Sequence, residues 1–406
     1  MNKSKSQTNT IRIRKYIIPV LLIFISSVCS RDKSDAERII VDEIEVVINR
    51  HEPYIVGGET KTLNLEEDFI IDLEEDEIAK LGLTDVWGFD VDSNRNVYFF
   101  KNPTSEGELV YKFDPTGRFI SSFALRGQGP GEVQMPSFQK FNARDELPIT
   151  DSGINMIKMF STDGTIVHTI DLGINIGFMG NMVYPLENGN YLIRRSLRGE
   201  VEGRHYFVMS LFDPEFNEIK ELDRFEVIQP IRADKVRLPM HVSVWCVSKN
   251  FIYVGNEDNG YEIHVYDFDG NLIKKIRKRY QPVKVHTVFK NYVNGQLKNT
   301  PPPFKNKIYF PEHFPPFQCI FSDNRGYLYV MTFETGTKPK EYRVDIFDRD
   351  GVLVGEISLD IFLNDPFFTP GAPLDSWITM KEDRLYTLRM KESGYKELVV
   401  YHTLWE

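Results

Sequence analysis

The sequence predicts an all-β fold: a six-bladed β-propeller with four-stranded antiparallel blades, closed by an N-terminal strand in the last blade. Two observations lead to this prediction. A strand-turn-strand pattern, first seen at Val110–Phe123, returns several times along the chain, and six inner hairpins can be counted. Because repeats that each form one small sheet are typical of propellers, the returns indicate a ring of similar sheets.

The turn inside the repeat has a recognisable chemistry. In the first copy, Asp114–Gly117 separates two runs in which apolar and polar residues alternate, as in half-buried strands. An aromatic residue precedes a turn residue in five copies: Phe113 and Gly117, Phe160 and Gly164, Phe212–Phe216 and Asn217, Tyr266 and Gly270, Phe347 and Gly351. Glycine and asparagine both accept the positive φ angle of a tight turn. The turns are about 47, 53, 53 and 81 residues apart, which suits blades joined by loops.

The first 60 residues are expected to lie outside the propeller. Residues 1–29 have a basic start, an apolar run that is short for a membrane span, and a lipobox-like end at Cys29. They predict a signal peptide whose Cys29 becomes lipidated, with an ordinary secretory signal as the alternative. Residues 30–60 are mostly polar and predict a tether, in which Ile39–Ile48 alternates weakly and could form a short strand. The expected location is the cell envelope, with a lipid anchor in a bacterial membrane.

Residues 61–406 are assigned to the propeller. The expected blades span about residues 86–123, 138–170, 182–222, 242–276, 318–357 and 376–403. Blade 6 ends without a fourth strand, and residues 68–73 have a sequence pattern like that of the fourth strands of the other blades. We therefore expect Phe69–Ile71 to pair with Val399–Tyr401, because an unclosed ring leaves an exposed strand edge.

Two segments carry a resemblance to a known family. They are Arg126–Glu132, which reads RGQGPGE, and Phe314–Phe317 ahead of Asp323–Gly326. On these residues the chain resembles the six-bladed β-propeller lipoproteins of bacteria, distant relatives of NHL-repeat propellers, over about residues 60–406. The resemblance implies the propeller fold and names no activity, because many members of this family have none assigned.

The glycine-rich run Arg126–Glu132 allows two interpretations. It lacks the Gly-Lys-Ser/Thr end of a phosphate loop and does not open a helix. It could carry the chain from the rim of one blade to the centre of the next, or present backbone amides to a ligand at the channel mouth. The first interpretation is favoured, because every propeller needs such a crossing.

Composition and motif searches exclude several classes of function. The net charge of −10 argues against nucleic-acid binding. The segment Asp90–Lys101 begins like a calcium loop but lacks its glycine and terminal glutamate, and no histidine pair has metal-binding spacing. Gly-x-Ser-x-Gly is absent. We therefore predict no metal ligand, no cofactor and no catalytic residue.

Two cysteines, Cys246 and Cys319, fall near the start of neighbouring inner strands. A disulfide would suit an exported protein. However, when the inner strands of blades 4 and 5 are aligned with each other, the two cysteines are offset by one position. Because neighbouring positions on a strand point to opposite faces, we expect two buried thiols.

Loop lengths indicate where binding occurs. The long connections all open on one side of the ring, which we call the long-loop face; they are Arg194–His205, Asp223–His241, Arg277–Phe317 and Ser358–Asp375. The candidate ligand-binding residues stand at or just before the start of inner strands: Arg126, Gln128, Asn181, His241 and Gln318. The aromatic residues of the third connection indicate either an ordered flap or packing against blade 5.

Two functions remain open. The first is an envelope-anchored, non-catalytic propeller that binds a partner protein or a small ligand on the long-loop face. The second is a metal-dependent hydrolase or lactonase-like enzyme with its site in the channel. The second needs several metal ligands from inner strands, which offer only His241, Asn142, Gln318 and Asp90, scattered among apolar residues. The binding function is therefore favoured.

Overall fold

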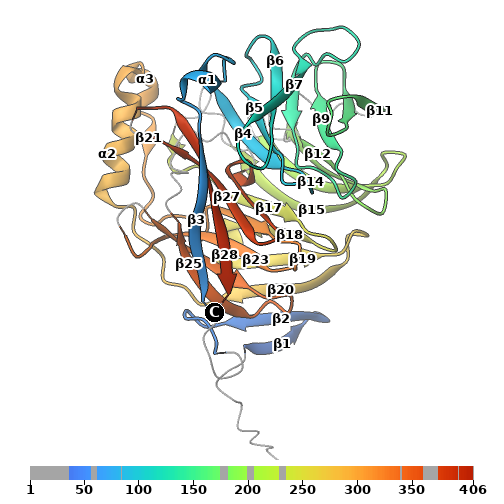
Figure 1. Cartoon of the computed structure of the whole chain (residues 1–406). Coiled ribbons are helices and arrows are strands. Elements are labelled where there is room, and N and C mark those ends of the chain that lie inside the picture. The colour runs from blue at the N-terminus through green and yellow to red at the C-terminus, as the bar shows by residue number, and fades with distance from the viewer. Residues whose placement is uncertain are drawn as a thin grey trace, which may run out of the picture. The chain divides into compact units, whose positions relative to one another are not determined.

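Six sheets follow one another along the chain, each built around an antiparallel meander (Figure 1). The computed structural model describes residues 36–55, 62–83, 85–173, 182–198, 205–227, 235–338, 341–359, 374–391 and 393–405. In this part of the chain, five sheets have four strands and the sheet of blade 4 has six. The predicted six-bladed β-propeller is confirmed. No helix among the described residues is long and apolar enough to cross a membrane.

The strands of the six blades have the following bounds. Blade 1 contains β4 (Val86–Val91), β5 (Val97–Lys101), β6 (Glu108–Phe113) and β7 (Phe119–Leu125). Blade 2 contains β8 (Pro136–Phe138), β9 (Leu147–Asp151), β10 (Met156–Phe160) and β11 (Ile166–Asp171). Blade 3 contains β12 (Met182–Pro185), β13 (Tyr191–Arg198), β14 (His205–Phe212) and β15 (Glu218–Val227).

The second half of the ring continues the pattern. Blade 4 contains β17 (Ser243–Val247), β18 (Ile252–Asn256), β19 (Glu262–Tyr266) and β20 (Leu272–Lys278). Blade 5 contains β22 (Cys319–Ser322), β23 (Leu328–Thr335), β24 (Tyr342–Phe347) and β25 (Leu353–Leu359). Blade 6 contains β26 (Ile378–Lys381), β27 (Arg384–Met390), β28 (Lys396–Trp405) and β3 (Leu63–Asp72). Two short helices, α1 (Asp76–Ala79) and η3 (Leu374–Trp377), precede blades 1 and 6.

The turn glycines join neighbouring blades. Gly117 and Gly164 adopt φ angles of 85° and 84°, which glycine tolerates best. A Cβ atom built on Gly164 would lie 2.6 Å from Phe123 on the outer strand of blade 1, and one on Gly117 would lie 3.1 Å from Ile71 on β3. The repeated glycine therefore serves both the turn and the close packing of one blade on the last strand of the blade before it.

The turn of blade 3 corrects the sequence interpretation. Asn217 was expected to take the place of the turn glycine, but the residue with positive φ is Phe216, at 62°. Asn217 instead donates a hydrogen bond from its side chain to Asp213 (2.9 Å). The ring of Phe216 stacks on Tyr191 with centroids 4.8 Å apart, and this contact offsets the cost of the unfavourable backbone angle.

The ring closes as the sequence predicted. Strand β3 pairs antiparallel with β28, so that Phe69 lies opposite Val400, Ile70 opposite Val399 and Ile71 opposite Leu398. This register is within one residue of the expected pairing. Strand β3, which comes before blade 1 in the chain, thus completes the last blade, as Figure 1 shows for the adjacent blue and red strands β3 and β28.

The segment predicted to be a tether contains a hairpin. Strands β1 (Glu37–Val41) and β2 (Ile44–Asn49) pair with each other, and β2 adds in parallel to β20 of blade 4. The fully buried Asn49 locks this arrangement: its amide donates to the carbonyl of Gly351 (2.9 Å), and its side-chain oxygen accepts from the amide of Leu353 (2.8 Å). The structure therefore differs from the expected tether over residues 37–49, because long-range pairing orders a segment with weak local pattern.

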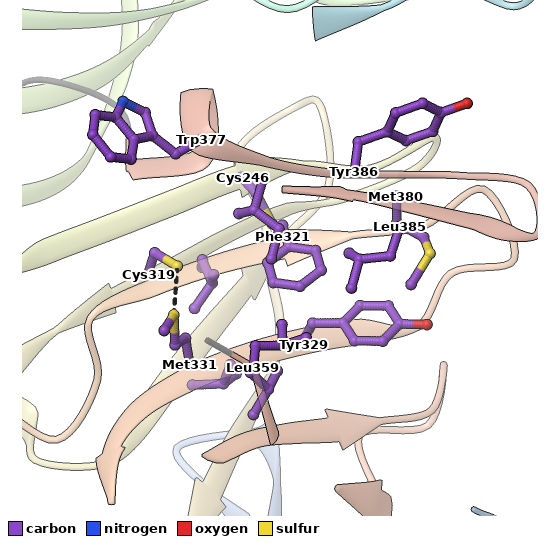
Figure 2. Close-up of a cluster of buried hydrophobic side chains, with 14 of the residues drawn as sticks. Cys246, Cys319, Phe321, Tyr329, Met331, Leu359, Trp377, Met380, Leu385 and Tyr386 are labelled. Carbon is purple, nitrogen blue, oxygen red and sulfur yellow. Dashed lines mark hydrogen bonds between the residues drawn. The ribbon is translucent and has the colours of Figure 1, made fainter. Parts of the chain in front are cut away.

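Cys246 and Cys319 are buried thiols, as their offset in register predicted. Figure 2 shows them within one apolar cluster that also contains Phe321, Tyr329 and Leu385. The thiol of Cys319 points toward the sulfur of Met331, 3.9 Å away. The cluster joins blades 4, 5 and 6, so these cysteines are part of the hydrophobic core.

Candidate functional site: the rim of blade 4

The long-loop face carries an ordered helical insert between blades 4 and 5. The insert, residues 279–317, contains α2 (Thr287–Gln296), η2 (Leu297–Asn299), α3 (Pro302–Lys305) and β21 (Ile308–Tyr309). Helix α2 begins where the side chain of His286 accepts a hydrogen bond from the amide of Phe289 (3.2 Å). Phe289 and Val293, four residues apart on one face of the helix, are both buried. Burial of this face therefore orders the insert.

The helical insert packs onto the propeller. Phe314 stacks on Phe333 of β23, with ring centroids 4.4 Å apart, and both rings are buried. Strand β21 pairs in parallel with β16 (Val236–Arg237), which lies in the crossing that leads into blade 4. The aromatic residues of this connection thus order the insert and also pack against blade 5.

Beside the insert, three side chains with metal-binding chemistry meet at the rim of blade 4. Nε2 of His241 lies 3.1 Å from Oδ1 of Asp258 and 3.8 Å from Oε1 of Glu257. The guanidinium of Arg237 pairs with the same oxygen of Glu257. We call His241, Glu257 and Asp258 the rim cluster. It is the one group of three potential ligands, drawn from His, Cys, Asp and Glu, among the residues that the structure describes.

The hairpin of β17 and β18 explains why these residues meet. Ser243 pairs with Asn256, so the residues just before β17 lie beside those just after β18. The amide of Glu257 accordingly donates to the carbonyl of Val242 (3.1 Å). Sequence reasoning selected His241 but missed Glu257 and Asp258, which the ends of one antiparallel hairpin could have indicated.

Blade 3 holds the imidazole in place. Phe225 of β15 stacks on the ring of His241, with centroids 5.4 Å apart and planes inclined by 14°. Next to this contact, Asp223 accepts hydrogen bonds from Ser243 (2.6 Å) and from the side chain of Asn256 (2.8 Å). The rim cluster is thus supported by two neighbouring blades: His241 lies two residues before β17, and Glu257 and Asp258 lie in a short 3-10 helix, η1 (Glu257–Asn259), that directly follows β18.

Three of the other predicted ligand-binding residues, Arg126, Gln128 and Gln318, are not part of the rim cluster. Arg126 leaves blade 1, opposite blade 4 in the ring, and donates from its side chain to the carbonyl of Thr104. Gln128 is exposed on the same crossing. Gln318 is buried and its side chain donates to the carbonyl of Thr332 (2.5 Å), so it satisfies backbone groups of blade 5. Asn181 and Cys29 lie outside the described residues.

The glycine-rich run folds around its own carboxylate. The side chain of Glu132 accepts a hydrogen bond from the amide of Gly129 (2.7 Å), and the amide of Gly127 donates to the carbonyl of Val133 (3.0 Å). A Cβ atom on Gly127 or Gly129 would collide with Glu132 or crowd it. These amides are therefore used within the crossing, which supports the interpretation as a blade connection.

The long connections are shorter than the sequence indicated. Strand β13 continues to Arg198 and β15 to Val227, so Arg194 and Asp223 belong to strands. Antiparallel pairing of β14 with both neighbours extends the two strands beyond the apolar alternation that ended them in the sequence. The greater part of the connection Ser358–Asp375 lies outside the described residues.

The inner-strand residues that were considered as metal ligands do not come together in the channel. Asp90 is buried, accepts a hydrogen bond from the amide of Phe141 (2.6 Å) and lies 3.5 Å from the ammonium of Lys140. Asn142 donates to Glu146 (2.8 Å) within its own turn. Of the inner-strand candidates, His241 alone joins other potential metal ligands, and it does so at the rim.

Comparison with known proteins agrees with this architecture. Residues 90–231 match the model of the DUF5128 family, described as a 6-bladed beta-propeller. The chain is a six-bladed β-propeller. No curated protein matches the propeller.

Solved structures similar to the propeller include three whose own chains are matched almost completely. A member of the DUF4221 family from Bacteroides vulgatus is 12% identical, with a TM-score of 0.45 over 85% of this chain and 98% of that one. A gluconolactonase from Xanthomonas campestris is 13% identical, with a TM-score of 0.41 over 84% and 99%. Virginiamycin B lyase from Staphylococcus aureus is 9% identical, with a TM-score of 0.40 over 85% and 100%. None of these likenesses bears on the activity of this propeller.

Proposed function

We propose that the protein is an envelope-anchored, non-catalytic binding propeller that presents its long-loop face to a partner protein. One observation carries the proposal. The helical insert is ordered by its own apolar cluster, yet Val288 on the outer side of α2 is 75% exposed. Long connections on one side of a rigid scaffold are a common place for binding, and Val288 gives this ordered connection an exposed apolar contact.

Site-specific photocrosslinking tests this proposal in the native cells. A photoreactive amino acid at Val288 is expected to give an adduct of defined mass, because this side chain would lie at the interface. The matched control is Val167 on β11, which is also an exposed valine (53%) but lies on an outer strand of blade 2. Adducts that are absent at Val288, or the same at both positions, would contradict a partner on the long-loop face.

The anchor is a second part of the proposal. The basic and apolar start of the chain and its lipobox-like end at Cys29 support lipidation of that cysteine. Cys29→Ala is expected to release the protein from the membrane fraction into the soluble fraction, because no acyl chains can then be attached. Cell fractionation and mass spectrometry of the mature N-terminus measure this. Unchanged membrane association together with a mature N-terminus other than Cys29 would exclude the anchor.

A further inference from the structure

We propose that the rim cluster binds one divalent transition-metal ion, for which zinc is the probe. The ligand atoms would be Nε2 of His241 and one carboxylate oxygen each of Glu257 and Asp258. This inference goes beyond the proposed function, because a partner could bind the long-loop face with or without an ion. Imidazole and carboxylate donors together suit zinc and related ions better than calcium or magnesium, which prefer oxygen ligands alone.

The spacing of the three ligand atoms fits such an ion. Zinc binds nitrogen and oxygen ligands at about 2.0–2.2 Å, which places two ligands of a tetrahedron roughly 3.4 Å apart. The distances from Nε2 of His241 are 3.1 Å to Asp258 and 3.8 Å to Glu257. All three ligand atoms lie within 4.8 Å of one another. Small side-chain rotations would therefore complete the coordination.

The imidazole of His241 supplies an independent indication. Both ring nitrogens are inaccessible to solvent and neither makes a hydrogen bond of good geometry; Nδ1 has no polar partner, and Nε2 has only the contacts with the carboxylates of Asp258 (3.1 Å) and Glu257 (3.8 Å). A buried polar atom without a hydrogen bond costs free energy, so it usually has a partner that the protein alone does not show. An ion bound at Nε2 would satisfy the nitrogen that faces the two carboxylates, while Phe225 keeps the ring in this orientation.

The local charge also favours a cation. The rim cluster has two carboxylates, and Arg237 supplies one positive charge to Glu257. Asp258 is exposed and carries the second negative charge toward His241. A divalent ion would therefore meet an excess of negative charge, with Glu257 shared between the ion and the guanidinium. Three protein ligands leave at least one coordination position for water.

The chain offers a matched control in another histidine–carboxylate pair. His264 lies 2.8 Å from Glu262 and has 20% of its side chain exposed, against 21% for His241. Glu262 is already neutralised by Arg277 and by Lys275, 3.5 Å away. Burial alone would raise the pKa of Glu262, but hydrogen bonds with His264 and Arg277 lower it to about 2. Among the residues that the structure describes, His264 does not belong to a group of three potential ligands, so it should not bind the ion.

The test measures zinc alone with the untagged full chain. Calorimetric titration and elemental analysis should find about one zinc ion per chain, and saturating zinc should raise the melting temperature, because an ion that binds only the folded state stabilises it. His241→Ala should weaken zinc binding by at least about 100-fold, since even loss of an outer partner costs 10–100-fold. His264→Ala should leave the affinity within about twofold.

Asp258→Asn provides a variant that is expected to fold normally, because Asp258 is exposed. It should weaken zinc binding by at least about tenfold. Circular dichroism confirms that each variant is folded. Absence of stoichiometric zinc in the wild-type chain would overturn the proposal. So would binding that survives His241→Ala and Asp258→Asn, or that is lost equally with His264→Ala.

Discussion

Asp345→Ala is expected to lower the free energy of unfolding by about 3–5 kcal/mol, because it removes one partner from a buried ion pair. Asp345 and Lys278 are both fully buried, and the ammonium lies 2.8 and 2.7 Å from the two carboxylate oxygens. Tyr261 donates to the same carboxylate (2.5 Å), and Arg343 lies 3.1 Å from it. Urea denaturation followed by tryptophan fluorescence measures the loss.

The phenol of Tyr261 stays protonated in this network. Burial raises its pKa well above the ordinary value, and the charge of Asp345 raises it further. Without the carboxylate, both this donor and the ammonium of Lys278 would remain buried without an acceptor.

Two variants serve as controls for Asp345→Ala. Glu221→Ala breaks the exposed pair with Arg224 and should cost no more than about 1 kcal/mol, since water screens such pairs. Adding Lys278→Met to Asp345→Ala should recover part of the loss, because it removes the unpaired ammonium. Equal destabilisation by Asp345→Ala and Glu221→Ala would show that the buried network is not important for stability.

Ile71→Ala is expected to lower the free energy of unfolding by about 2–5 kcal/mol, whereas Ile70→Ala should cost less than about 1 kcal/mol. The two residues are neighbours on β3, but their side chains point to opposite faces. Ile71 is 2% exposed and packs against the turn of Gly117, whereas Ile70 is 39% exposed. Ile71→Ala therefore weakens the contact between the closing strand and blade 1.

Urea denaturation and amide hydrogen exchange measure this second effect. In the wild-type protein, the amides of β3 and β28 that bond the two strands should exchange slowly, since they share one closed sheet. Ile71→Ala should speed exchange in β3 and β28 more than in blade 3. Equal effects of Ile71→Ala and Ile70→Ala on stability would contradict a packing role for the closing strand.

Local patterns allowed much of the fold to be predicted. The period-two alternation and the aromatic–glycine turns located the hairpins of the blades, because strand and turn propensity act over a few residues. Counting the strands of blade 6 located the missing partner, which β3 supplies. The expected one-position offset of Cys246 and Cys319 in blade register similarly predicted two buried thiols, and both thiols are buried.

The sequence-based predictions were wrong where a segment's conformation depends on a contact with residues far away in the sequence. The hairpin of β1 and β2 becomes part of blade 4 through parallel pairing with β20 and through Asn49, whose partners lie in blade 5. Phe216 adopts a positive φ angle because Tyr191 supports its ring. Neither contact leaves a local pattern that a sequence can show.

The sequence by itself determined the all-β class, the number of blades and the strand that closes the ring, because these follow from short-range periodicity and from the need to leave no open sheet edge. Only the tertiary structure decided the candidate site. His241, Glu257 and Asp258 have no motif spacing, and they meet because two strands of one hairpin end side by side. Side-chain geometry around a site depends on pairing register and on the neighbouring blade, here Phe225, rather than on residue spacing.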